Sequence, residues 1–294
     1  DPAAFAAECE AAHEKKIRDA ARRIAAHRDR SHIILLSGPS GSGKTTTALK
    51  IEEQLEKMGI ETHTVSMDNY FNTIDPETAP RNREGAIDYE SPFCLDVDLL
   101  NRHFAMLDRG ETIHVPKYEF ARQMRSDIMS RPMRLGPGEL ASFEGIHALN
   151  PVITDSLPSE NLMKLYVSVS SRIADEDGDV LMSKRDLRFV RRLVWDYYHR
   201  ASSVERTYDI WGSVQRGEDK YIFPYSHLAA EKIDSLHAYE PCVFRALAVP
   251  MLSSVGSGSE WYDEAQMMIE RLERFEPLPV DVIPENSLLR EFMD

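Results

Sequence analysis

The 294-residue chain has few cysteines, no long hydrophobic run and no excess of positive charge. Its three cysteines, Cys9, Cys94 and Cys242, lie far apart, a spacing that excludes a cysteine-based zinc site and a disulfide framework. No apolar stretch approaches the roughly 20 residues that cross a bilayer, and the chain opens without a signal-peptide pattern. We therefore expect a reduced, cytoplasmic protein that is not inserted in a membrane.

Positive charge is scarce overall and gathers in one segment. The formal net charge is −14 at pH 7, which argues against a general binder of nucleic acid or of anionic membranes. Between Lys184 and Lys220, however, nine lysine and arginine residues outnumber six acidic ones. A basic segment within an acidic chain indicates a local role toward an anionic ligand.

A glycine-rich loop is the most informative segment. The apolar run 32–36 leads into Gly38-Pro-Ser-Gly-Ser-Gly-Lys-Thr45, which matches G-x-x-x-x-G-K-[ST] at every required position and precedes a helical pattern. Such a loop surrounds a phosphate chain with main-chain N–H groups. Its lysine contacts the β/γ-phosphates, and its threonine hydroxyl binds Mg²⁺. The sequence therefore predicts a nucleoside triphosphate site. The residues predicted to bind it are Gly38, Ser40, Gly41, Ser42, Gly43, Lys44, Thr45 and Thr46.

Hydrophobic periodicity predicts helices and strands in alternation. The predicted helices cover 3–28, the segment from the loop to Gly59, the segment from Asp96 or Asp98 to Gly110, 185–200, and a last one that opens on a Ser257…Glu260 capping box. The predicted strands are 32–36, 61–67, 140–143, 162–169 and 246–252. A functional loop is expected over 69–92, irregular strands or a hairpin over 111–135, and an extended tail from Pro277.

This alternation, with a phosphate loop after the first strand, predicts an α/β, three-layer P-loop NTPase fold. Its sheet is mostly parallel, has helices on both faces and binds ligands at the carboxyl ends of its strands.

Two acidic residues follow predicted strands. Asp68 ends the second strand, and Glu144 follows 140–143. Both would then lie at the sheet edge that carries the phosphate loop, where a kinase needs one carboxylate to orient a hydroxyl and another to hold Mg²⁺. Alternatively, Asp68 caps a turn and Glu144 is a surface residue. Because the two acids occur together beside one phosphate loop, each supports the functional interpretation of the other.

The predicted helix 185–200 carries Arg185, Arg188 and Arg192 at positions i, i+3 and i+7. A run of charge on a helix is usually a solvated face. In an acidic chain that binds polyphosphate, we favour a closing lid whose arginines neutralise charge on the transferred phosphoryl group.

These motifs together resemble the uridine kinase/phosphoribulokinase family of P-loop kinases over about residues 31–250. The matched segments are the phosphate loop, 67–71, 88–92, 116–125, 143–146 and 191–200. Segments 144–151, 222–224 and 286–292 are similar to a long bacterial branch whose members carry an N-terminal region resembling part of threonyl-tRNA synthetase. Since the chain opens on Asp1, we expect that region to precede it in a longer protein.

The resemblance implies a role for individual residues. It implies Asp68 as the catalytic base, with Lys44, Arg192 and Arg200 as catalytic cations, and ATP and Mg²⁺ as cofactors. Thr45, Glu144 and Asp68 would serve the metal ion. The implied acceptor-binding residues are Tyr70, Glu90, Tyr118, Gln123, Arg125 and Arg188.

Three positions depart from the family pattern. Glu90 stands where the family has a ribose-binding Asp, Gln123 where well-known members have a pyrimidine-contacting His, and Trp195 where the lid has an arginine. An amide still hydrogen-bonds a pyrimidine edge, but tryptophan does not replace a bidentate arginine.

We therefore expect an ATP-dependent kinase, acting in pyrimidine salvage, that phosphorylates the 5′-hydroxyl of a nucleoside, uridine or cytidine. A sugar phosphate or other metabolite as acceptor, or a regulatory nucleotide-binding module without efficient transfer, are the alternatives. A small-molecule nucleoside is the expected partner, without nucleic acid or membrane, and a homo-oligomer is compatible with the sequence. The expected organisation is an N-terminal helix (1–30), a kinase domain (31–252, lid about 183–226) and a C-terminal helix and tail (253–294).

Overall fold

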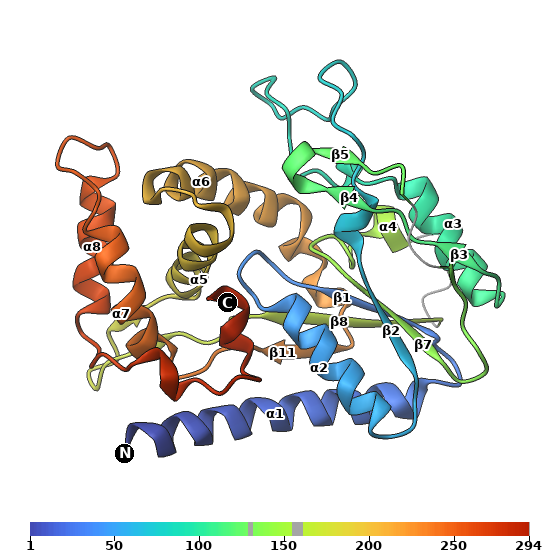
Figure 1. Ribbon diagram of the computed structural model, residues 1–294, viewed down its shortest axis with the longest axis horizontal. Coiled ribbons are helices and arrows are strands. Elements are labelled where there is room, and N and C mark those ends of the chain that lie inside the picture. The colour runs from blue at the N-terminus through green and yellow to red at the C-terminus, as the bar shows by residue number, and fades with distance from the viewer. Residues whose placement is uncertain (129–131, 155–160, 294) are drawn as a thin grey trace.

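The computed structural model describes residues 1–128, 132–154 and 161–293, and a five-stranded parallel sheet lies at its centre (Figure 1). The strand order is β11-β8-β1-β7-β2. The strands are β1 (Ile33–Ser37), β2 (Thr62–Ser66), β7 (Leu140–Glu144), β8 (Leu162–Ser168) and β11 (Glu231–Asp234). The predicted parallel α/β sheet is confirmed, with the first strand in its middle.

Alternating side chains of the central strand enter two separate apolar clusters. Ile34 and Leu36 pack with α1 (Pro2–His27) and α2 (Lys44–Glu56) on one face. Ile33 and Leu35 pack with α3 (Val97–Asp108) and α4 (Pro151–Thr154) on the other. All of β1 is buried because both faces are covered, as expected of a parallel core strand. The predicted three layers are therefore present.

A third apolar cluster lies beyond the carboxyl ends of the strands, on the side of the phosphate loop (Figure 1). Its helices are α5 (Lys184–Arg200), α6 (Val204–Tyr221), α7 (Glu240–Leu252) and α8 (Tyr262–Leu272). The last residues return to it as a 3-10 turn, η7 (Leu288–Phe292). The helix predicted at 185–200 is confirmed as α5, and α6 follows it within the range 183–226, whose role as a lid stays a prediction.

Short strands and turns surround these layers. The segment 111–133 contains two small antiparallel pairs, β3 (Ile113–His114) with β6 (Pro132–Met133) and β4 (Tyr118–Glu119) with β5 (Met124–Arg125). Strands β9 (Ile173–Ala174) and β10 (Val180–Met182) pair before α5. The irregular strands predicted over 111–135 are thus present, while residues 129–131 of that range lie outside the described residues.

Two sequence-based assignments near the end of the chain are wrong. The strand predicted at 246–252 belongs to helix α7, because a helix buried on several sides is as continuously apolar as a core strand. The fifth strand is instead β11, a polar edge strand in which Ile233 alone is fully buried. The predicted Ser257…Glu260 capping box is also absent, since α8 begins at Tyr262 without a side-chain cap.

Candidate active site

The phosphate loop joins β1 to α2 in a conformation that its glycines require. Gly41 and Gly43 have φ angles of 71° and 79°, in the left-handed region that favours glycine. A Cβ on Gly38 would lie 2.1 Å from the carbonyl oxygen of Val167. The Lys44 ammonium bends back over the loop and donates to the Pro39 carbonyl at 3.2 Å. The first amides of α2 therefore point at the space that this loop encloses, as an anion site requires.

The two predicted acids lie at neighbouring strand ends beside this loop. Glu144 is the last residue of β7 and is paired in register with Ser66 of β2, two residues before Asp68. The Thr45 hydroxyl donates to Glu144 Oε1 at 3.4 Å. Burial raises the pKa of Asp68, and the nearby charges of Lys44 and Arg200 oppose that rise. Burial also raises the pKa of Glu144, which Lys44 opposes and Asp68 reinforces. The fold thus gathers Lys44, Asp68, Glu144 and Arg200.

Oxygen ligands of the kind that Mg²⁺ prefers converge here. The Thr45 hydroxyl and the Glu144 carboxylate are in contact, and the Asp68 carboxylate is close enough to raise the pKa of Glu144. These are the three residues predicted for the metal. Their hard oxygen donors fit such an ion, although their role at it stays a prediction.

Helix α5 places Arg192 at the phosphate loop and Arg200 near Asp68. Arg192 donates to the Ser40 hydroxyl at 2.9 Å and to Asp196 at 2.7 Å. Arg200 lies 3.5 Å from the same Asp196 carboxylate. The indole of Trp195 lies beneath both guanidinium groups, 5.7 Å from Arg192 and 4.7 Å from Arg200. The tryptophan that departs from the family pattern therefore contacts both arginines of α5 by cation–π interaction.

Arg188 lies beneath the phosphate loop in a buried ion pair. It makes two hydrogen bonds to Glu218 of α6, at 2.6 and 2.8 Å, and donates to the Ser40 carbonyl at 2.9 Å. The Ser40 amide in turn donates to Glu218 at 3.0 Å. Arg188 thus holds the loop in this structure. Its predicted contact with the acceptor stays a prediction that this packing does not favour.

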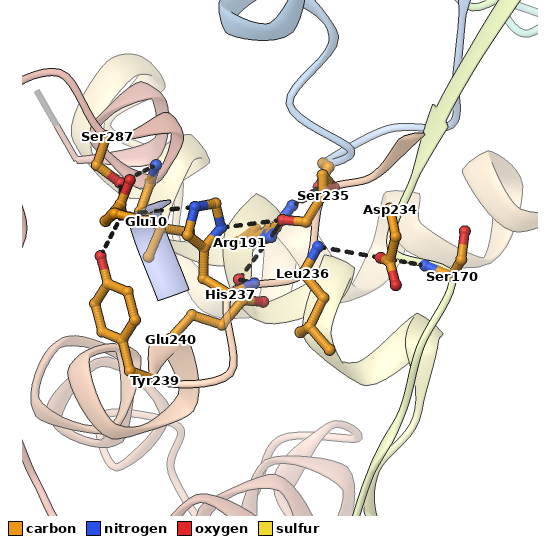
Figure 2. Close-up of polar contacts among 12 residues, drawn as sticks. Glu10, Ser170, Arg191, Asp234, Ser235, Leu236, His237, Tyr239, Glu240 and Ser287 are labelled. Carbon is orange, nitrogen blue, oxygen red and sulfur yellow. Dashed lines mark hydrogen bonds and ion pairs between the residues drawn. The ribbon is translucent and has the colours of Figure 1, made fainter. Parts of the chain in front are cut away.

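Arg191 is a second buried anchor of the loop. It donates to the Gly41 carbonyl at 3.2 Å. It also donates to the Ser235 carbonyl at 2.9 Å and to Glu240 at 2.6 Å (Figure 2). No sequence motif indicated a separate role for Arg191, Glu218 or Glu240. Only the adjacent arginines at 191 and 192 were a local signal, and they did not show that one of the pair turns inward.

The segment that carries Glu90 approaches Asp68 and Arg192. Burial and the neighbouring carboxylate of Glu218 raise the pKa of Glu90 to about 7, while Arg192 opposes the rise. A Cβ on Gly217 would lie 2.3 Å from Glu90 Cβ, so α6 packs closely on this residue because it has a glycine there. The charge of Asp68 also raises the pKa of Glu90, so Glu90 lies near the sheet edge that carries Asp68.

The β4–β5 hairpin brings the remaining predicted acceptor residues together. Tyr118 packs against Phe71 and Phe120, with ring centroids 5.5 and 5.0 Å apart. Gln123 sits exposed at the turn with a φ of 52°. Arg125 is held by Asp96 at 2.9 Å. The hairpin therefore presents an aromatic surface and an amide beside the loop that carries Glu90.

Tyr70 occupies a different environment from the one predicted. Its side chain is fully buried, and its hydroxyl hydrogen-bonds His103 Nδ1 at 2.8 Å. Its carbonyl oxygen accepts from Arg125 at 3.1 Å. In this structure Tyr70 supports the acceptor side through its main chain, and direct contact with a substrate is not favoured.

The sequence profile of the phosphoribulokinase/uridine kinase family matches residues 33–238, which include the phosphate loop, both acids and the arginine helix. The chain belongs to this family. A uridine kinase of Staphylococcus aureus (strain JH9) is 33% identical over 194 residues, 65% of this chain and 82% of the relative. Family members are phosphotransferases that act on hydroxyl groups, so the protein is a kinase.

Two solved structures have a weak likeness to this chain. One is described as a possible uridine kinase from Bacillus stearothermophilus, with 17% identity, 70% coverage of this chain, 89% coverage of that chain and a TM-score of 0.43. The other is a D-glycerate 3-kinase from Cryptococcus neoformans, with 14% identity, 94% coverage of this chain, 87% coverage of that chain and a TM-score of 0.38. Within the described residues, no helix is both long and apolar enough to span a membrane.

Proposed function

We propose that this kinase transfers the γ-phosphoryl group of ATP to the 5′-hydroxyl of a nucleoside, uridine or cytidine. The observation that carries the proposal is the convergence of Asp68 with Lys44, Arg200 and Glu144 at one sheet edge. A protein that only binds a nucleotide has no need of a half-buried carboxylate opposite the phosphate loop. A kinase needs that group to orient the attacking hydroxyl and accept its proton.

The residues of the phosphate half have separate tasks in this proposal. The loop amides and Lys44 bind the phosphates. Thr45 and Glu144 would hold Mg²⁺, which would supply positive charge to the phosphate oxygens. Arg192 and Arg200 neutralise the charge that spreads over the phosphoryl oxygens in the transition state. Because Trp195 and Asp196 already orient both guanidinium groups, little reorganisation is needed.

The acceptor half supports a nucleoside through complementary chemistry. Glu90 offers carboxylate oxygens to ribose hydroxyls, and the aromatic surface of Tyr118 offers a face to a planar base. Gln123 and Arg125 supply hydrogen-bond groups at the rim of the hairpin. The similarity to the Staphylococcus aureus uridine kinase favours a pyrimidine nucleoside over a sugar phosphate.

Acceptor-dependent ADP release tests this proposal. Uridine, cytidine, adenosine, guanosine and a set of sugar phosphates are each offered with Mg²⁺-ATP to the wild type and to Asp68→Asn. We expect turnover with uridine or cytidine, and a loss of about 10²- to 10⁴-fold in kcat for Asp68→Asn with unchanged ATP affinity. Asp75→Asn, in the exposed part of the following loop, is the matched control and should keep full activity.

Several outcomes would change the assignment. Turnover with a sugar phosphate alone would establish the alternative acceptor class. Absence of acceptor-dependent ADP release with every compound, despite ATP binding, would favour a nucleotide-binding module. Full turnover by Asp68→Asn would remove Asp68 as the base.

A further inference from the structure

The C-terminal turn of the chain contacts the phosphate loop. Glu291 lies in η7, and its carboxylate oxygen Oε2 accepts a hydrogen bond from the Thr46 amide at 3.1 Å. These two residues are 245 positions apart in the chain. Thr46 belongs to the first turn of α2, whose N-cap is Gly43. In Figure 1 the C-terminal end lies beside α2 and α5, next to this loop.

The backbone around Glu291 is firmly held. Leu288 and Leu289 are fully buried, and a Cβ on Gly43 would lie 2.7 Å from a methyl carbon of Leu288. The Phe292 ring packs under the Arg191 guanidinium at 5.1 Å. Glu291 itself is only half-buried. Its side chain therefore has room to turn toward solvent, while the turn that carries it stays in place.

A buried polar network fixes the start of this turn. The Ser287 hydroxyl and the Tyr239 hydroxyl both donate to Glu10 of α1 (Figure 2). His237 stands beside the same carboxylate, its Nε2 3.5 Å from Glu10. Both ends of the segment around Glu291 are thus tied to buried groups.

The Thr46 amide is one of the groups that a phosphate loop offers to its ligand. Amides in the first turn of a helix have no partner within the helix, and in this motif they bind the α- and β-phosphates. A carboxylate and a phosphate cannot both accept from one N–H at close range, since two anions repel each other strongly at a partly buried site. Glu291 is also near enough to Glu144 to contribute to the raised pKa of that acid.

We propose that Glu291 is an affinity-determining residue of the nucleotide site: its carboxylate holds the Thr46 amide until a phosphate oxygen of the nucleotide displaces it. This inference rests on the proposed nucleotide-binding role of the phosphate loop. Only the side chain has to move, because the apolar residues on both sides of it are buried. The carboxylate therefore weakens the binding of every ligand that places a phosphate on this amide.

The substitution Glu291→Gln removes the negative charge of this side chain and keeps its size and shape. The amide side chain still has an oxygen that accepts from Thr46, but it no longer repels a phosphate. We expect ADP and inorganic pyrophosphate to bind roughly tenfold more tightly than to the wild type, and adenosine to bind equally well. Because the effect is electrostatic, 0.5 M salt should reduce it. Glu285→Gln, an exposed carboxylate of the same tail, is the control and should leave all three affinities unchanged.

Isothermal titration of ADP, pyrophosphate and adenosine provides the measurement, with thermal melting to verify that each variant is folded. Equal or weaker binding of ADP to Glu291→Gln overturns the proposal, as does an equal gain for Glu285→Gln. If Glu291→Gln is unfolded, Glu291→Asp is used. The shorter aspartate side chain reaches the Thr46 amide less well, so this variant should also bind ADP more tightly than the wild type. The titrations need no acceptor, so tight ADP binding without nucleoside turnover would contradict the proposed kinase substrate and leave this inference intact.

Discussion

Individual carboxyl groups of the site are held in surroundings that oppose their ionisation. Burial raises the pKa of Asp68, Glu90 and Glu144, and each lies near at least one of the others. Lys44, Arg192 and Arg200 act in the opposite direction. The site therefore balances closely spaced acids against nearby cations, a balance that an arriving Mg²⁺-nucleotide would shift toward ionised carboxylates.

Glu90 should make the stability of the protein depend on pH near neutrality. Its pKa is about 7 in the folded chain, against 4.5 as the ordinary value for glutamate. The folded state therefore holds this proton more tightly than the unfolded state, and Glu90 lowers the free energy of unfolding as pH rises from about 4.5 to 7. We expect Glu90→Gln to flatten this decline, by about 2 kcal/mol between pH 5 and 8 in urea denaturation. An identical slope in both proteins would contradict the assigned pKa.

The arginines of helix α5 lie in three different environments. Arg185 pairs with Asp219 in solvent, Arg188 pairs with Glu218 in the interior, and Arg192 reaches the Ser40 hydroxyl. Helical periodicity correctly predicted the helix and its arginine-rich face. It did not predict which arginine is buried, since that depends on where α6 places its carboxylates.

Adjacent residues of α6 provide a matched test of this division. Glu218→Gln leaves the Arg188 charge buried without its counter-charge, and its single amide oxygen cannot serve both Arg188 and the Ser40 amide as the two carboxylate oxygens do, so we expect a loss of about 3 kcal/mol in stability and a raised KM for ATP. Asp219→Asn breaks only the exposed pair with Arg185 and should cost less than about 1 kcal/mol. Chemical denaturation and ATP-dependent kinetics measure both effects. Equal losses in the two variants would show that Glu218 does not anchor the loop.

At the scale of the whole molecule, both ends of the chain reach the kinase core. Helix α1 packs on the sheet through Ile17 and Ile24, and Lys16 donates to the Asp234 carbonyl of β11 at 3.0 Å. The C-terminal turn ends at the phosphate loop. The division at residues 30 and 252 stays a prediction, and the segments on either side of both points share apolar clusters.

Truncating an α1 side chain should therefore destabilise the kinase fold as a whole. Ile17 is 1% exposed, so Ile17→Ala should lower the free energy of unfolding by about 2–4 kcal/mol in a single cooperative transition. Lys15→Ala, at an exposed neighbouring position, should change it by less than about 0.5 kcal/mol. A separate early transition for α1, with the rest of the protein unaffected, would show that the helix is an independent appendage.

The sequence by itself determined the phosphate loop, the two strand-end acids and the arginine helix. Each depends on residues close together in the chain: closely spaced glycines set the loop conformation, and local periodicity sets strand ends and helix faces. Only the tertiary structure decided that Glu218 and Glu291 hold amides of that loop, that Arg191 turns inward and that Tyr70 is buried. The partners in these contacts are distant in sequence, and no local pattern records which carboxylate the packed chain brings to which amide.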